Sequence, residues 1–330
     1  WFVDFLRGAL SGPEVNAVTA LTIPAYWACV RLISQDVAML PLRPVRLLDG
    51  VGSETASEHP SYRLVHAEAN PESTKIAVFE TWLSHALIYS AGYLEIQRDG
   101  AGRPAALWNI DPTRTRPVRD QERMLWYETQ DHQGRPIYLR PEDVLVLHGL
   151  GYSGLVGYAL SRLTSDALAA TLGGLKANAK LFENGVIPSG YFTHPGRLTE
   201  QALHHLRQGI ADRYAGVENS WKPVILEEGM KFEASGLSPE DAQLIEALRH
   251  GVENVCRLFG VPLYKVQSMN GTTFASVDAL AVDYLQALLP WIVRIEQELD
   301  RKLVTSPERG RVVFKHSVRG LLRGDLKTQA

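Results

Sequence analysis

The order of apolar and polar positions divides the chain into a mixed first half and a mainly helical second half. Apolar residues recur at helical spacing over 21–40 and again over 75–90, where Phe79 and Leu83 share one face. Between 92 and 148 the apolar residues alternate or form short runs, and Gly, Pro and Asp separate them, which is typical of strands and turns. The first half therefore predicts an α+β fold rather than repeated strand–helix–strand units.

The second half is dominated by three amphipathic helices, predicted over 158–182, 238–260 and 276–304. Pro290 lies inside the third helix and should kink it, because proline removes a backbone hydrogen bond. A glycine pair at 173–174 interrupts the first helix at a cost of about 1 kcal/mol per residue relative to alanine. We interpret this pair as a place of close packing against a neighbour.

A compact insertion, 189–236, separates the first two of these helices. Its pattern predicts a strand at 190–193, a helix over 199–214 and a hairpin that joins 224–226 to 230–232. A polar loop follows the second helix and precedes the third. This order indicates a stalk with a small α/β knob at its end.

Composition excludes several classes of protein. Of the 330 residues, 45% are hydrophobic and 22% charged, which is ordinary for a globular chain and unlike a disordered or collagen-like one. No apolar run reaches the length of a membrane span, so we expect no membrane partner. The two cysteines, Cys29 and Cys256, are too few for a disulfide framework, and a reducing compartment is the default.

The charge balance also limits the ways in which the chain can meet nucleic acid. With 34 basic and 37 acidic residues, the formal net charge is −3. A protein that grips the DNA backbone tightly is usually basic, so the balance argues against a repressor or histone-like binder. It allows a protein that lets a polyanion slide past.

The strongest enzyme-like signal is the GxGxxG pattern at Gly149–Gly154, which follows an apolar strand. A dinucleotide site also needs a second parallel strand about 20 residues further on, and the helical pattern from 158 onward leaves no room for it. A P-loop is excluded because the chain contains no Gly-Lys dipeptide. We interpret the pattern as a tight turn and keep a nucleotide-binding enzyme as the alternative.

No catalytic, cofactor or metal site is predicted. The chain has neither HExxH nor CxxC, and the adjacent His204 and His205 would point in different directions on a helix. The acidic pairs Glu227-Glu228 and Glu240-Asp241 are explained by a hairpin tip and a helix start. The chain is therefore not expected to be an enzyme.

Short stretches spread over almost the whole chain resemble one protein family in their order. They are Ile23–Pro41 with the run Pro24–Ile33, His59-Pro60, Asn70-Pro71, Gly92–Ile96 with Arg98-Asp99, Asp143–Leu145 with His148, Phe182–Gly185, Phe259–Pro262 and Leu321–Asp325. Each stretch is short, but the ordered set is specific. On these residues the chain resembles the HK97-type portal proteins of tailed bacteriophages.

The resemblance implies a non-enzymatic subunit of a homo-oligomeric ring, usually of twelve copies, at one vertex of a phage or prophage capsid. Double-stranded DNA would be packaged and later ejected through its central channel without sequence specificity. Expected partners are the large terminase, head-completion or adaptor proteins, and scaffold or capsid proteins. The ring would be assembled in the bacterial cytoplasm and become part of the virion. Another virion connector without a packaging role is the remaining alternative.

The resemblance also divides the chain into parts. They are a wing (1–157 and 307–330), two stem helices (158–187 and 238–260), a clip (188–237), a tunnel loop (261–275) and a long kinked helix (276–306). A C-terminal crown would follow the Leu321–Asp325 segment in the family. A slightly acidic chain with a loop rich in Asn, Gly, Ser and Thr suits weak, sequence-blind contacts with phosphates.

Candidate site residues follow from this division. The DNA-channel residues of the tunnel loop are Gln267, Ser268, Met269, Asn270, Gly271, Thr272 and Thr273. Basic residues that are candidates for facing the channel are Arg249, Arg257 and Lys265, with solvent or subunit salt bridges as the alternative. Candidates for docking the packaging motor on the clip are Glu227, Glu228, Arg207 and Arg213.

Overall fold

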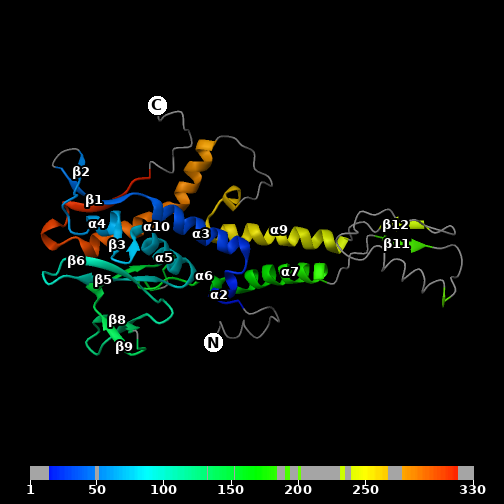
Figure 1. The fold of residues 1–330 in the computed structure, drawn as a ribbon, viewed down its shortest axis with the longest axis horizontal. Helices are drawn as coiled ribbons and strands as arrows, with labels where there is room; N and C mark the ends of the chain where they lie inside the picture. The colour runs from blue at the N-terminus through cyan, green and yellow to red at the C-terminus, as the bar shows by residue number, and fades with distance from the viewer. Residues whose placement is uncertain are drawn as a thin grey trace. The chain divides into compact units, whose positions relative to one another are not determined.

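The chain forms two compact units (Figure 1). Unit 1 comprises Trp1–Gly173 and Arg249–Ala330, and unit 2 comprises Gly174–Leu248. Unit 2 includes the whole of the insertion predicted over 189–236. The computed structural model describes residues 15–48, 52–131, 133–151, 153–183, 190–193, 200–201, 231–234, 239–266 and 277–318.

Helix α3 (Pro24–Met39) forms within the segment predicted to be helical, and Pro24 occupies its first turn, where a missing N–H is tolerated. It packs against α5 (Lys75–Ile88), the second helix predicted in this half. A one-turn helix, α2 (Ala17–Ala20), precedes α3 and is missing from the sequence prediction. Asn16 caps it by accepting two backbone N–H groups. A single turn is too short to leave a periodic pattern.

The described strands pair only in antiparallel fashion, which confirms the α+β class. The first sheet has the order β13 (Val312–His316), β1 (Leu42–Leu47), β2 (Ser53–Thr55). The second has the order β10 (Val144–Leu147), β5 (Gly92–Arg98), β6 (Pro104–Ile110). The third has the order β7 (Arg116–Arg119), β8 (Leu125–Gln130), β9 (Pro136–Leu139). Smaller elements of unit 1 are α4 (Tyr62–His66), β3 (Glu68–Asn70), β4 (Ser73–Thr74), η1 (Pro141–Asp143) and η4 (Ser306–Glu308).

The first sheet joins the two ends of the described chain. Strand β1 pairs with β13 in a register that runs from Leu42 opposite His316 to Arg46 opposite Val312. Both strands alternate between buried and less buried positions, and Leu42 and Phe314 are fully buried. The polypeptide that leaves unit 1 through one long helix therefore returns to complete a sheet begun near its start.

Helix α10 (Val277–Leu303) is the predicted third long helix, and Pro290 lies inside it. Figure 1 shows its axis changing direction along its length, as expected for an internal proline. Its buried face, which includes Leu288, Ile292 and Ile295, contributes to the core of unit 1. The same helix contacts both β10 and β13, so it lies between the two sheets.

The predicted single helix over 158–182 is wrong in one respect. The structure has a one-turn helix, α6 (Leu160–Leu163), and then α7 (Ser165–Glu183), with a break at Thr164. The hydroxyl of Thr164 donates to the carbonyl of Leu160 at 2.7 Å. A threonine that bonds to the backbone in this way offers the chain an alternative to continuous helix.

Unit 2 is described only in part. Strand β11 (Gly190–Thr193) forms where predicted and pairs with β12 (Lys231–Ala234). The predicted partner of 230–232 was 224–226, and that segment lies outside the described residues, as does nearly all of the helix predicted over 199–214.

Several residues of the stretches that carried the resemblance hold unit 1 together. The Nδ2 of Asn70 donates to the carbonyl of Leu107 at 2.9 Å, which ties a turn to β6. The guanidinium of Arg98 on β5 donates to the Asp143 carboxylate at 2.7 Å, next to β10. The Trp82 indole donates to the carbonyl of Gly92 at 3.1 Å, so α5 lies directly on the start of β5. The occurrence of these residues in the matching stretches is therefore explained by their role in stabilising the fold of unit 1.

Replacing Gly92 with alanine should destabilise the protein strongly, because a Cβ at this position overlaps the backbone carbonyl oxygen of Trp82. Overpacking of this kind costs about 3 kcal/mol when backbone must move. A matched control is Gly173→Ala, where a Cβ meets nothing within 4 Å and alanine favours the helix. Urea unfolding of both variants measures the difference, and equal stability of Gly92→Ala and wild type would contradict the packing of α5 on β5.

Candidate functional site

The candidate site lies where the second long helix, α9 (Pro239–Phe259), ends in unit 1. There α9 comes close to α7: a Cβ on Gly251 would lie 2.9 Å from both Oγ1 and Cγ2 of Thr171. Only a glycine permits this approach without movement of the threonine. The glycine pair at 173–174 was interpreted as a place of close packing against a neighbour; within this chain Gly173 faces open space, and packing against another subunit stays a prediction. The residue that allows the approach is Gly251.

Helix α9 ends next to Gly260, as the sequence predicts. Gly260 has φ +66°, a left-handed conformation that glycine adopts without strain. Its N–H donates to the carbonyl of Arg257 at 3.3 Å, and the N–H of Val261 donates to that of Cys256 at 3.0 Å. This pair of bonds is the Schellman arrangement, and Pro262 follows it. The helix end therefore has a defined geometry that fixes the direction of the next segment.

The segment after Pro262 is a 3₁₀ helix, η3 (Leu263–Val266), where the sequence predicted loop. It is held to α10, because the ammonium of Lys265 lies 4.5 Å from the ring centroid of Tyr284. Tyr284 is buried, and its hydroxyl donates to the Asp36 carboxylate of α3 at 2.8 Å. Burial and this carboxylate raise the pKa of Tyr284, so the hydroxyl stays protonated as a donor.

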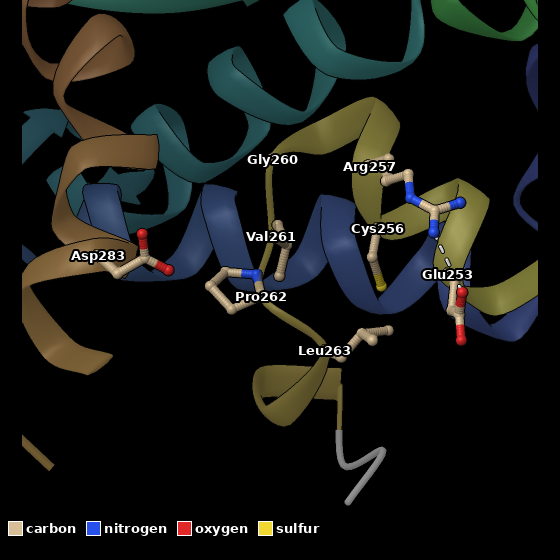
Figure 2. A pocket seen from close by; sticks show the side chains of 8 residues that line it. All are labelled: Glu253, Cys256, Arg257, Gly260, Val261, Pro262, Leu263 and Asp283. Atoms are coloured by element: carbon tan, nitrogen blue, oxygen red, sulfur yellow. Dashed lines mark hydrogen bonds and ion pairs between the residues drawn. The ribbon is translucent and has the colours of Figure 1, made fainter. Parts of the chain in front are cut away.

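A cavity of about 260 Å³ opens at this helix end (Figure 2). Its lining combines apolar and charged side chains from α9, the turn after it and α10, namely Glu253, Cys256, Arg257, Gly260, Val261, Pro262, Leu263 and Asp283. In the described part of the chain no group of three or more His, Cys, Asp or Glu side chains is placed to hold a metal ion.

Two of the three basic candidates have partners within the chain. The guanidinium of Arg257 donates to Asn254 at 2.7 Å and lies 3.2 Å from the Glu253 carboxylate. Lys265 lies on the Tyr284 ring. Arg249 is exposed on α9. A role for these three residues in a channel stays a prediction.

The other predicted site residues lie outside the described residues. They are the tunnel-loop residues 267–273 and the clip residues Arg207, Arg213, Glu227 and Glu228. The structure does place the two anchors of the loop, because η3 ends at Val266 and α10 begins at Val277. The Lys265–Tyr284 contact joins η3 to α10, about two helical turns after the start of that helix.

Sequence reasoning missed the contacts that join α3 to this site. The rings of Tyr26 and Phe259 meet edge to face with centroids 4.9 Å apart, and the thiols of Cys29 and Cys256 lie close enough for each to shift the pKa of the other. The partners are far apart in the sequence, so no spacing rule connects them. The sequence shows only that each of these four residues lies within a periodic apolar segment, which does not identify its partner.

The GxGxxG stretch forms a turn, as predicted. Gly151 bridges Gly157, and the N–H of Tyr158 donates to the carbonyl of Leu150 at 2.9 Å. Helix α6 follows two residues later, and β10 pairs antiparallel with β5. The described strands thus provide none of the parallel pairing that a dinucleotide fold requires.

None of the described helices is both long and apolar enough to cross a membrane.

Comparison with known proteins gives a consistent result. The family model for phage portal protein matches residues 24–330. The chain is 28% identical over 308 residues to the probable portal protein of Streptomyces phage phiC31, across 89% of this chain and 66% of the phage protein. It is 25% identical over 329 residues to the portal protein of Enterobacteria phage HK97, across 98% of this chain and 77% of that protein.

The fold is also similar to that of a solved structure. A chain in the neck of a native gene transfer agent particle with C12 symmetry has a TM-score of 0.68 and 20% sequence identity, and the match covers 93% of this chain and 85% of that chain. At this identity the likeness concerns the fold.

The contact between α7 and α9 can be tested by a double-mutant cycle. Gly251→Ala should lower the free energy of unfolding by about 1–2 kcal/mol, because the new Cβ collides with the Thr171 side chain. Adding Thr171→Ala should restore most of the loss, since the atoms at 2.9 Å are then removed. Urea unfolding of the wild type, the single variants and the double variant gives the coupling. Additive losses would contradict the contact.

Proposed function

Because the chain belongs to the phage portal protein family, we propose that it is one subunit of a ring, of twelve copies, at one vertex of a phage capsid. Double-stranded DNA enters the capsid through the central channel during packaging and leaves through it at ejection. The observation that carries this proposal is the family match over residues 24–330, which spans nearly the whole chain. The number of twelve copies comes from the family resemblance; the structurally similar neck of a native gene transfer agent particle was computed with C12 symmetry.

We assign the proposed parts of the subunit to elements of the fold. The antiparallel sheets of unit 1, including the sheet that β13 completes, belong to the wing. Helices α7 and α9 are the stem, and their close approach at Gly251 suits a stiff support. The clip, 188–237, lies within unit 2 and carries the motor-docking candidates.

The tunnel loop is proposed to line the channel. Its residues Gln267 to Thr273 are polar or small apart from Met269, so their contacts with DNA are weak and independent of base sequence. The loop starts from η3, which Lys265 holds to α10, and it ends at α10 itself. A loop that is attached firmly at both ends can contact moving DNA without disturbing the packing of the wing.

The proposed partners are macromolecules rather than small molecules. The large terminase and later the head-completion or adaptor proteins dock on the clip, and scaffold or capsid proteins surround the wing. Assembly takes place in the bacterial cytoplasm, and the ring then remains in the virion. We propose no catalytic step for the chain itself.

Ring formation is the first test. The purified chain should elute as a large oligomer, and electron micrographs should show rings with a central hole and about twelvefold symmetry. Native mass spectrometry then counts the subunits. A stable monomer that binds NAD or ATP saturably in calorimetry would contradict the proposal and revive the nucleotide-binding alternative. Rings that fail to co-sediment with a large terminase would favour a connector without a packaging role.

The tunnel loop gives a second, independent test. Asn270→Arg with Thr272→Arg should reduce packaged DNA at least tenfold while rings still form, because the added charges attract phosphates and slow the moving DNA. The matched control adds the same charge at Met124→Arg with Tyr138→Arg, two exposed positions on the third sheet and its turn. Nuclease-protected DNA measures packaging. Wild-type packaging in the loop variant would remove the loop from the channel.

A further inference from the structure

The only two cysteines of the chain meet in the folded protein. Cys29 lies on α3 and Cys256 on the last turns of α9, and both side chains are buried. The two thiols lie close enough for each to shift the pKa of the other. Figure 2 shows the Cys256 sulfur pointing toward the ribbon of α3. Because the two residues are far apart in the sequence, it is the fold, and not a local motif, that brings the thiols together.

A second contact one helical turn away keeps the pair in register. Tyr26 and Cys29 lie three residues apart on α3, and Cys256 and Phe259 lie three residues apart on α9. The Tyr26 and Phe259 rings are in edge-to-face contact at 4.9 Å. Residues three apart share one face of a helix, so the two helices present matching faces and hold the sulfur atoms opposite each other.

The two thiols differ in their chemistry. The hydrogen bond from Cys29 lowers the pKa of Cys256, since a thiolate gains more from a donor than a thiol does. The same hydrogen bond and burial raise the pKa of Cys29. The thiolate is the reactive form of cysteine, and the position of Cys256 in the cavity lining assigns it as the nucleophile and Cys29 as the resolving thiol.

Cys256 contributes to the lining of a cavity, with 3% of the residue exposed, whereas Cys29 does not. Cys256 lines the cavity of about 260 Å³ at the end of α9. The cationic side chain of Arg257 lies in the same lining, beside Glu253. Cys29 is 0% exposed and is absent from the lining. A reagent in the cavity therefore reaches one sulfur first.

We propose that Cys29 and Cys256 form a redox-active dithiol that a small-molecule disulfide, such as oxidised glutathione, converts to an intramolecular disulfide. The Cys256 thiolate attacks one sulfur of the reagent, forms a mixed disulfide and releases one thiolate. The Cys29 thiol then loses its proton and attacks Sγ of Cys256, which forms the Cys29–Cys256 bond and releases the second thiolate. The two cysteines lose two electrons and two protons, and the reagent is reduced to two thiols.

The bond has a structural consequence. It ties α3, in the core of unit 1, to the last turns of α9, one turn before the Gly260 helix end from which η3 starts. In a reducing cytosol the pair remains as thiols, and in oxidising surroundings it closes. Oxidation therefore fixes the junction between the long helix and the core.

The experiment treats the reduced, folded full chain with excess oxidised glutathione under native conditions. Alkylation followed by mass spectrometry should show the loss of both free thiols, a decrease of two hydrogens in mass and a linked pair of peptides carrying Cys29 and Cys256. The Tm should rise by about 5–10 °C and return to its original value with dithiothreitol. Two free thiols and an unchanged Tm after prolonged treatment would overturn the proposal.

Single variants test the order of attack. Cys29→Ala lacks the resolving thiol, so Cys256 should retain one glutathione as a stable mixed disulfide. Cys256→Ala should leave Cys29 unmodified, because it has no access to the cavity. Equal labelling of the two variants would mean that reaction proceeds through unfolded chains and would overturn the proposal. Circular dichroism checks that each variant is folded. If either variant is unfolded, the peptide map and the Tm of the oxidised wild type test the proposal instead.

Discussion

Helix α10 is the element on which unit 1 depends, because its side chains bond to the backbone of two edge strands. Toward β13, the carboxylates of Glu296 and Asp300 accept the N–H groups of His316 at 2.8 Å and Phe314 at 2.6 Å. Toward β10, Lys302 donates to the carbonyl of Val144 at 3.0 Å, and a neighbouring glutamate accepts a further strand N–H. Edge strands carry unpaired backbone groups, so the helix satisfies both sheets at once and fixes their spacing along its own axis.

This role explains why ionisable groups are tolerated in the core. Burial raises the pKa of Glu296, but hydrogen bonds from His316 and Lys315 outweigh it and hold the pKa below its usual value. Burial lowers the pKa of Lys302, which nevertheless lies 3.6 Å from the Glu298 carboxylate. A buried charge is costly unless it is paired and hydrogen-bonded, and each of these is. The hydrogen bonds of these polar groups therefore determine which strands α10 contacts. Apolar packing alone would not select these strands.

The sequence predicts elements whose signals are local and misses those decided by distant partners. The end of α9 follows from Gly260 and Pro262, because glycine in a left-handed conformation and a following proline are local requirements. Strand β6 lies in the 92–148 segment that predicts strands, but its two alanines give no alternation of their own, and its pairing with β5 decides its bounds. The break at Thr164 depends on one side-chain bond that competes with the helix. In the candidate site, the composition of residues 267–273 predicts a loop, which stays a prediction because these residues lie outside the described part of the chain, whereas the contact of α3 with α9 depends on the whole fold.

The charges around the helix end bear on how strongly DNA would be bound in the proposed channel. A protein that neutralises phosphates releases counterions and binds tightly, which would oppose movement. Here the Arg257 guanidinium already lies 3.2 Å from Glu253, and the Lys265 ammonium rests on the Tyr284 ring. Cations with partners in their own chain have less to gain from a phosphate, because binding must first disrupt the existing contact. With a formal net charge of −3, the chain as a whole adds no compensating attraction. If the proposed channel holds DNA near this helix end, the packing of these side chains as well as the composition of the chain would keep the interaction weak.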